Sequence, residues 1–96
     1  MIKHIVCWKV KPEERKDLVK EFEKRLMSLP PVISEIKDFE VGVNINKSDA
    51  AYDVVLYSSF DSIDDLKTYQ GHTKHQEVAD FIKANTTQRV VVDYQI

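Results

Sequence analysis

Apolar and polar residues alternate with a period of two in four segments of the chain, residues 2–10, 39–45, 52–60 and 88–96. Successive side chains of a strand point to opposite faces of a sheet, so each segment is predicted to be a β-strand with one apolar face. We expect these apolar faces to form the core side of one sheet. They comprise Ile2, His4, Val6, Trp8 and Val10; Phe39, Val41, Val43 and Ile45; Tyr52, Val54, Leu56 and Phe60; and Val90, Val92, Tyr94 and Ile96.

Two helical stretches separate these strands. In the first, Leu18, Phe22 and Leu26 recur four residues apart, which is the spacing of one face of an amphipathic helix. Pro12 suits the first turn because proline has no N–H to leave unpaired there, and Pro30 ends the helix.

The second helical stretch begins where Ser62 can cap it and is predicted to break near Gly71. Thr73 and Gln76 have the spacing of a capping box, which predicts that a new helix starts there and continues to Asn85. The order strand, helix, two strands, helix, strand indicates a single α+β domain over residues 1–96. We predict a ferredoxin-like βαββαβ fold, with a four-stranded antiparallel sheet and both helices on one face.

The opposite face of this sheet decides whether the domain pairs with a copy of itself. It is expected to present an apolar patch of Ile5, Cys7, Val55, Tyr57 and Val91. A contiguous exposed apolar patch usually marks an interface, and a symmetric face-to-face dimer covers it most simply. We therefore predict a homodimer, a dimeric α/β barrel, while a lightly apolar solvent face is the alternative.

Composition narrows the possible functions. Hydrophobic residues make up 43% and charged residues 31% of the chain, and the net charge is −2, so there is no basic surface that would predict nucleic-acid binding. No apolar run approaches the roughly 20 residues of a membrane span, and no signal peptide is recognised. The single cysteine, Cys7, cannot form an internal disulfide, so a cytoplasmic location is expected.

Histidine and tyrosine are the residues that suggest chemistry. His4 lies on a core face, and Tyr69, His72 and His75 follow one another three residues apart, on one side of the second helical stretch. An imidazole exchanges protons near neutral pH, and a phenol hydroxyl can stabilise a developing enolate. This set suits enolisation, aldol-type ring closure or isomerisation of a carbonyl compound. Structural roles for the same residues are the alternative.

No cofactor or metal site is predicted. His72 and His75 are three residues apart, one fewer than in a helical metal-binding pair, and Cys7 is expected on the opposite face of its strand. The chain also has no phosphate-binding glycine loop and no pattern of a nucleophilic triad.

Several segments together resemble the stress-responsive A/B barrel (Dabb) domain family. They are Ile2-Lys3-His4-Ile5-Val6, Tyr52-Asp53-Val54-Val55-Leu56, Phe60-Asp61-Ser62, Leu66-Lys67-Thr68-Tyr69, His72-Thr73-Lys74-His75 and Val90-Val91-Val92-Asp93-Tyr94. The resemblance covers the whole chain and implies a dimeric α+β barrel. The family includes plant stress-associated proteins and, as a distant relative of this chain, the plant polyketide cyclase that makes olivetolic acid without metal or cofactor.

The resemblance implies roles for individual residues. Tyr69 and His75 match the catalytic residues of the cyclase, and His4 matches a pocket residue. Our first hypothesis is a homodimer with a small apolar pocket that binds or transforms a carbonyl or aromatic compound. In it, His75 and Tyr69 are catalytic, and the ligand-binding residues are His4, Trp8, His72 and Tyr94. A non-enzymatic, stress-associated oligomer is the competing hypothesis, and monooxygenase chemistry is a third that rests on fold analogy alone.

Overall fold

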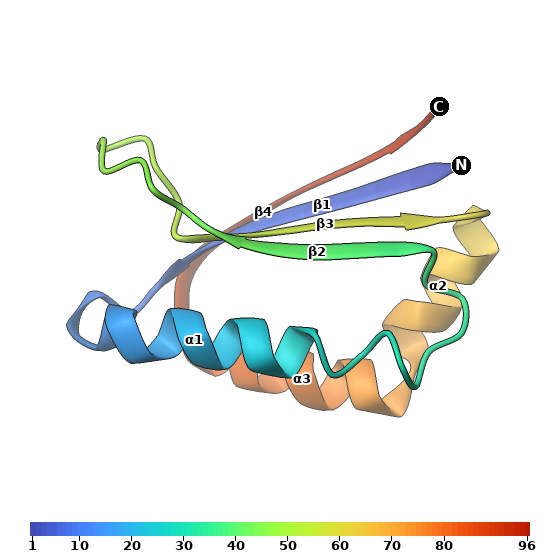
Figure 1. The fold of residues 1–96 in the computed structure, drawn as a ribbon, viewed down its shortest axis with the longest axis horizontal. Coiled ribbons are helices and arrows are strands. Elements are labelled where there is room, and N and C mark those ends of the chain that lie inside the picture. Colours follow the sequence, from blue (N-terminus) through green and yellow to red (C-terminus); the bar gives the residue numbers. More distant parts are fainter.

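A computed structural model describes all 96 residues as one four-stranded sheet packed on helices (Figure 1). In chain order the elements are β1 (Ile2–Val10), the short 3-10 turn η1 (Pro12–Glu14), α1 (Arg15–Leu26), β2 (Asp38–Val43), β3 (Val54–Phe60), α2 (Ile63–Gly71), α3 (Thr73–Ala84) and β4 (Thr86–Gln95). The strands lie in the order β2-β3-β1-β4, and every neighbouring pair is antiparallel. The predicted ferredoxin-like fold is confirmed.

The helices cover one face of the sheet, below it in Figure 1, and the core lies between the two layers. Burial alternates along β1, where His4, Val6 and Trp8 face the helices. Phe22 of α1 and Phe60 of β3 are fully buried in the same core. We call this side of the sheet the helix face, and the opposite side the open face.

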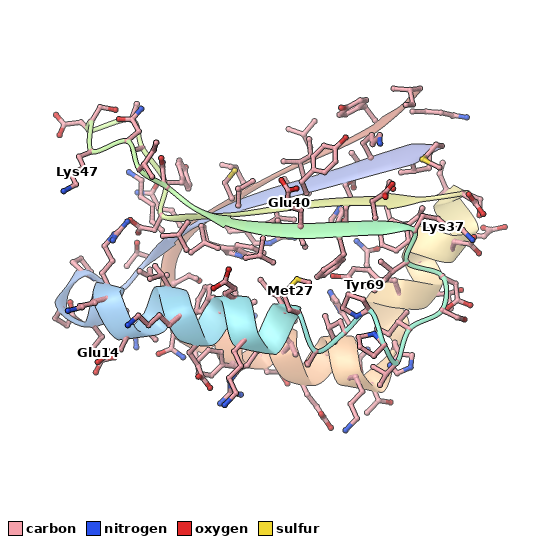
Figure 2. All side chains as sticks on the ribbon, viewed as in Figure 1. Glu14, Met27, Lys37, Glu40, Lys47 and Tyr69 are labelled. Carbon is pink, nitrogen blue, oxygen red and sulfur yellow. The ribbon has the colours of Figure 1, made fainter.

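The open face carries the residues that alternate with the core positions. Ile5 pairs with Tyr57 and Cys7 with Val55, and directly opposite residues of an antiparallel pair share a face. Glu40 pairs with Tyr57 and points away from the helices (Figure 2). The predicted faces of the first three strands are therefore confirmed.

The predicted orientation of the last strand is wrong. In the observed register His4 lies opposite Asp93, Val6 opposite Val91, and Trp8 opposite Arg89. Arg89, Val91 and Asp93 therefore lie on the helix face, whereas Val90, Val92 and Tyr94 lie on the open face. Val90, Val91 and Val92 are consecutive, so the strand presents apolar side chains on both of its faces. The period of two therefore does not distinguish the two orientations of the strand.

Two strand ends also differ from the prediction. β2 ends at Val43, and Ile45 lies beyond it with 95% of its surface exposed. β3 starts at Val54, so Tyr52 precedes the strand. Both residues belong to the long connection between β2 and β3, where Ile45 is exposed and Tyr52 is half-buried beneath the Lys9 side chain.

The break between α2 and α3 occurs where the sequence predicted it, but a different residue caps α3. The His72 Nδ1 atom accepts a hydrogen bond from the Lys74 backbone N–H at 3.1 Å, so His72, and not Thr73, is the N-cap. Ser62 caps α2 as predicted and accepts from the Asp65 N–H. No helix is long and apolar enough to cross a membrane.

Candidate functional site

A cavity of about 510 Å³ opens between α3 and the helix face of β1 and β4. Apolar side chains from the sheet and α3 form its middle, histidines and a tyrosine lie toward the start of α3, and polar and basic groups lie toward the start of β4. The lining residues are His4, Val6, Trp8, Leu26, Leu56, Tyr69, His75, Val78, Ala79, Ile82, Lys83, Thr86, Thr87, Gln88 and Arg89. A mostly apolar cavity with a few polar groups is typical of a small-molecule site.

Tyr69 lies near the end of α2, in the layer between the sheet and the helices (Figure 2). Its side chain is 1% exposed and packs in a tilted arrangement on Phe60. Burial raises the pKa of the Tyr69 hydroxyl well above its ordinary value of 10.0, because a phenolate is poorly solvated there. At neutral pH the hydroxyl is therefore a proton-bearing hydrogen-bond donor.

His75 lies in the first turn of α3, edge to face against Tyr69, with ring centroids 4.4 Å apart. Its Nδ1 lies 3.0 Å from the Gln70 carbonyl oxygen. A carbonyl oxygen only accepts hydrogen bonds, so Nδ1 carries the hydrogen and Nε2 keeps a free lone pair in the neutral ring. The ring can therefore accept a proton at Nε2.

The pKa of His75 is lowered from its ordinary value of 6.5, and burial is the largest cause. The hydrogen bond to the Gln70 carbonyl opposes this shift, whereas the charges of His4, Arg89 and His72 add to it. His75 is therefore neutral at physiological pH, which is the state a general base requires.

His4 forms a side-chain hydrogen bond that the sequence analysis missed. Its Nδ1 lies 2.5 Å from Asp93 Oδ1, across the β1–β4 pair. The His4 ring is buried, and its centroid lies 6.3 Å from that of Tyr69. A carboxylate accepts, so Nδ1 donates to Asp93, and this contact fixes the orientation of the ring in the cavity wall.

A signal for Asp93 was present in the sequence. When the first and last strands pair in antiparallel fashion and end together, the fourth residue of the chain lies opposite the fourth from its end. These residues are His4 and Asp93 in this chain of 96 residues. A buried imidazole needs a partner, so the pairing was predictable once the two strands were known to be neighbours.

The structure brings four of the six predicted site residues to the cavity: His4, Trp8, Tyr69 and His75. It does not bring the other two. His72 turns back to cap α3, and Tyr94 lies opposite Lys3 on the open face. The prediction missed Lys83 and Arg89, which line the other end of the cavity. No group of three or more His, Cys, Asp or Glu side chains is arranged to hold a metal ion.

The family model of the stress responsive A/B barrel domain (Dabb) matches residues 2–96. The chain belongs to this family. No curated protein matches the chain. The resemblance inferred from the sequence of this Dabb domain is therefore confirmed.

Solved structures agree with this assignment. A dimeric protein of unknown function with a ferredoxin-like fold, from Bacteroides fragilis NCTC 9343, is 33% identical with a TM-score of 0.89, and the match covers 99% of this chain and 95% of that one. A dimeric ferredoxin-like protein of unknown function from Thermobifida fusca YX is 25% identical with a TM-score of 0.88, over 99% and 90% of the two chains. The hydroxynitrile lyase of Passiflora edulis is similar in fold, at 19% identity and a TM-score of 0.76, over 99% and 92%.

Proposed function

We propose that this Dabb domain forms a homodimer in which each cavity binds a small carbonyl compound and catalyses its enolisation, ring closure or isomerisation without a cofactor. One observation carries this proposal. A neutral imidazole with a free Nε2 lone pair and a protonated phenol lie in contact, at 4.4 Å between ring centroids, in the wall of a cavity large enough for a small molecule.

The proposed reaction starts with transfer of a proton from the carbon beside the substrate carbonyl to His75 Nε2. The electron pair of the broken C–H bond moves onto the carbonyl oxygen, and the Tyr69 hydroxyl stabilises this oxyanion by donating a hydrogen bond. His75 then returns the proton to a carbon, which gives isomerisation. Alternatively the enolate carbon attacks a second carbonyl of the same molecule, and His75 protonates the new alkoxide, which gives ring closure.

His4 orients the ligand in this proposal. The hydrogen bond from Nδ1 to Asp93 holds the ring against the Tyr69 side of the cavity and leaves Nε2 to contact the ligand. Trp8 supplies an apolar wall farther along β1.

Exchange of carbon-bound hydrogen for deuterium tests the enolisation step without knowledge of the natural substrate. A panel of methyl ketones, keto acids and polyketide-like lactones is incubated with the protein in D₂O, and loss of the α-proton signal is followed by NMR. We expect the wild type to accelerate exchange for at least one compound, and His75→Ala to abolish the acceleration. His72→Asn is the matched control, because asparagine can still cap α3 and residue 72 lies outside the cavity. Acceleration that survives in His75→Ala, or no acceleration for any compound, would contradict the proposal.

The open face supports the homodimer. Val90, Val92 and Tyr94 extend the apolar patch of Ile5, Cys7, Val55 and Tyr57 across the sheet, so the patch is wider than the sequence predicted. Val91 is not part of it. The Bacteroides fragilis and Thermobifida fusca relatives are described as dimeric. A cytoplasmic location stays a prediction from the single cysteine.

A second candidate function is that of a non-enzymatic, stress-associated oligomer. The partners of both cavity histidines favour it, because His4 pairs with Asp93 and His75 pairs with the Gln70 carbonyl, as structural histidines do. In that case replacing either imidazole lowers stability and changes no ligand binding. Thermal unfolding of His75→Ala, measured beside deuterium exchange, separates the two functions.

A further inference from the structure

The cavity is positively charged at one end. Lys83 near the end of α3 and Arg89 in β4 both line it, and neither forms a salt bridge within the chain. No aspartate or glutamate is among the lining residues. We call the part of the cavity formed by Lys83 and Arg89 the basic end.

The backbone of the basic end lies well away from that of the Tyr69–His75 pair, although the charge of Arg89 is close enough to lower the pKa of His75. Arg89 pairs with Trp8, four residues along β1 from His4, which corresponds to about 13 Å at the usual rise of a strand. Lys83 lies eight residues after His75 in α3, or about 12 Å at the helical rise of 1.5 Å per residue. Two different elements thus give a similar separation between the ends of the cavity.

The wall at the basic end also contains a hydrogen-bond donor without an acceptor. Trp8 is 5% exposed, and its Nε1 is the one buried side-chain nitrogen or oxygen without a partner. Buried donors are nearly always paired. This N–H has almost no accessible surface, so the two unpaired cations are the groups that make this end rich in accessible donors and poor in negative charge.

We infer that the basic end binds a carboxylate, so that the ligand is a keto acid with its carbonyl at Tyr69 and His75 and its carboxylate at Arg89 and Lys83. This inference rests on the proposed function, since it specifies the substrate class of the same cavity. A guanidinium binds a carboxylate with two parallel hydrogen bonds, and the ammonium of Lys83 adds a second charge. Between the two ends, Val6, Val78 and Ile82 provide an apolar wall for a hydrocarbon chain.

A matched pair of probes tests this inference. 7-Oxooctanoate and its neutral amide, 7-oxooctanamide, differ only at the end that is expected to reach Arg89. Their dissociation constants are measured by NMR titration of the wild type, the Lys83→Gln/Arg89→Gln double variant, and the control Lys20→Gln. Lys20 is an exposed lysine of α1 outside the cavity.

We expect the wild type and Lys20→Gln to bind the acid about tenfold more tightly than the amide, as charge-assisted hydrogen bonds at a partly exposed site should give. In the double variant the two probes should bind within about twofold of each other. Raising the salt concentration should weaken the preference of the wild type for the acid.

The outcomes separate this inference from the proposed function. Equal binding of acid and amide to the wild type, with shifted His75 signals, overturns the carboxylate assignment and leaves the cavity as a carbonyl site. A preference for the acid that persists in the double variant also overturns it. If neither probe binds the wild type, both the inference and the proposed ligand site fail.

Discussion

Asp93 accepts a hydrogen bond from the buried His4 ring, across the pair formed by the first and last strands of the chain. This contact joins the two ends of the sequence at the wall of the cavity. It also orients the His4 Nε2 atom. The contact therefore has consequences for stability and for the site.

Replacing Asp93 with alanine is expected to lower the free energy of unfolding by about 1 kcal/mol, because the buried Nδ1 donor of His4 loses its acceptor while the carboxylate itself is half-exposed. Asp93→Asn should lower the free energy of unfolding by less, since an amide oxygen still accepts a hydrogen bond. Urea unfolding measures both. Asp80→Ala, an exposed position of α3, is the control. If Asp93→Ala is no less stable than this control, the pair does not contribute to stability.

Tyr69→Phe separates the two possible roles of the tyrosine. The ring fills the core, so Tyr69→Phe should keep the free energy of unfolding within about 0.5 kcal/mol of the wild-type value. Tyr69→Ala should lower it by about 3–5 kcal/mol, because the truncated side chain leaves a cavity. Loss of the hydroxyl should lower any catalysed enolisation about 100-fold, the typical effect of removing an oxyanion donor. Thermal unfolding and deuterium exchange are compared in the same variants. A Tyr69→Phe protein that is much less stable but equally active would refute the catalytic role.

His75 gives a prediction for pH. Burial lowers its pKa in the folded protein, and the neighbouring groups are the Gln70 carbonyl and the charges of His4, Arg89 and His72. The neutral ring is the active form, so activity should be constant above pH 6.5 and fall as the pH drops through the lowered pKa. An NMR titration of the His75 ring protons should give a midpoint below 6.5; a midpoint at or above this value would contradict the prediction.

The same shift affects stability. Below pH 6.5 the unfolded chain binds a proton at His75 more readily than the folded chain does, so His75 lowers the stability as the pH falls from 6.5 to the folded pKa. Denaturant unfolding at pH 7.5 and pH 5.5 measures the loss. His75→Gln, which does not titrate, should lose less stability over this interval than the wild type.

Two neighbouring valines test which face forms the dimer. Val92 on the open face is 57% exposed, and Val91 on the helix face is 44% exposed. The two side chains therefore have similar exposure but lie on opposite faces of the sheet. Val92→Glu would place a charge in the proposed interface, twice in each symmetric dimer, and should weaken dimerisation at least about 100-fold. Val91→Glu should leave the dimer intact.

Analytical ultracentrifugation of both valine variants measures the association. The proposed interface would be wrong if Val92→Glu remained dimeric at the concentrations at which the wild type is dimeric, or if Val91→Glu alone dissociated. Circular dichroism of each variant checks that the fold is retained.

Much of the fold was predictable from the sequence because its local signals agree. The leucines and Phe22 of α1 recur at helical spacing, Ser62 caps α2, and the second helical stretch is interrupted beside Gly71. The faces of β1 and β3 follow from their alternation, since the face with more apolar residues in each strand is the buried one, although it includes His4 in β1 and Ser58 in β3. The prediction of Tyr69, His75, His4 and Trp8 at one cavity rested on the same regularities and on the family resemblance.

The sequence by itself determined the order and type of the elements, because helical and strand periodicities and caps are local properties, and the resemblance of its segments to the Dabb family indicated the family. The tertiary structure decided the orientation of β4, because its apolar run fits either face and only the pairing with β1 selects one. That choice brings Asp93 to His4 and Arg89 to the cavity, and moves Tyr94 to the open face. It also decided between His72 and His75, because a three-residue spacing places both on one side of a continuous helix, whereas the break at the start of α3 uses His72 as a cap and leaves His75 against Tyr69.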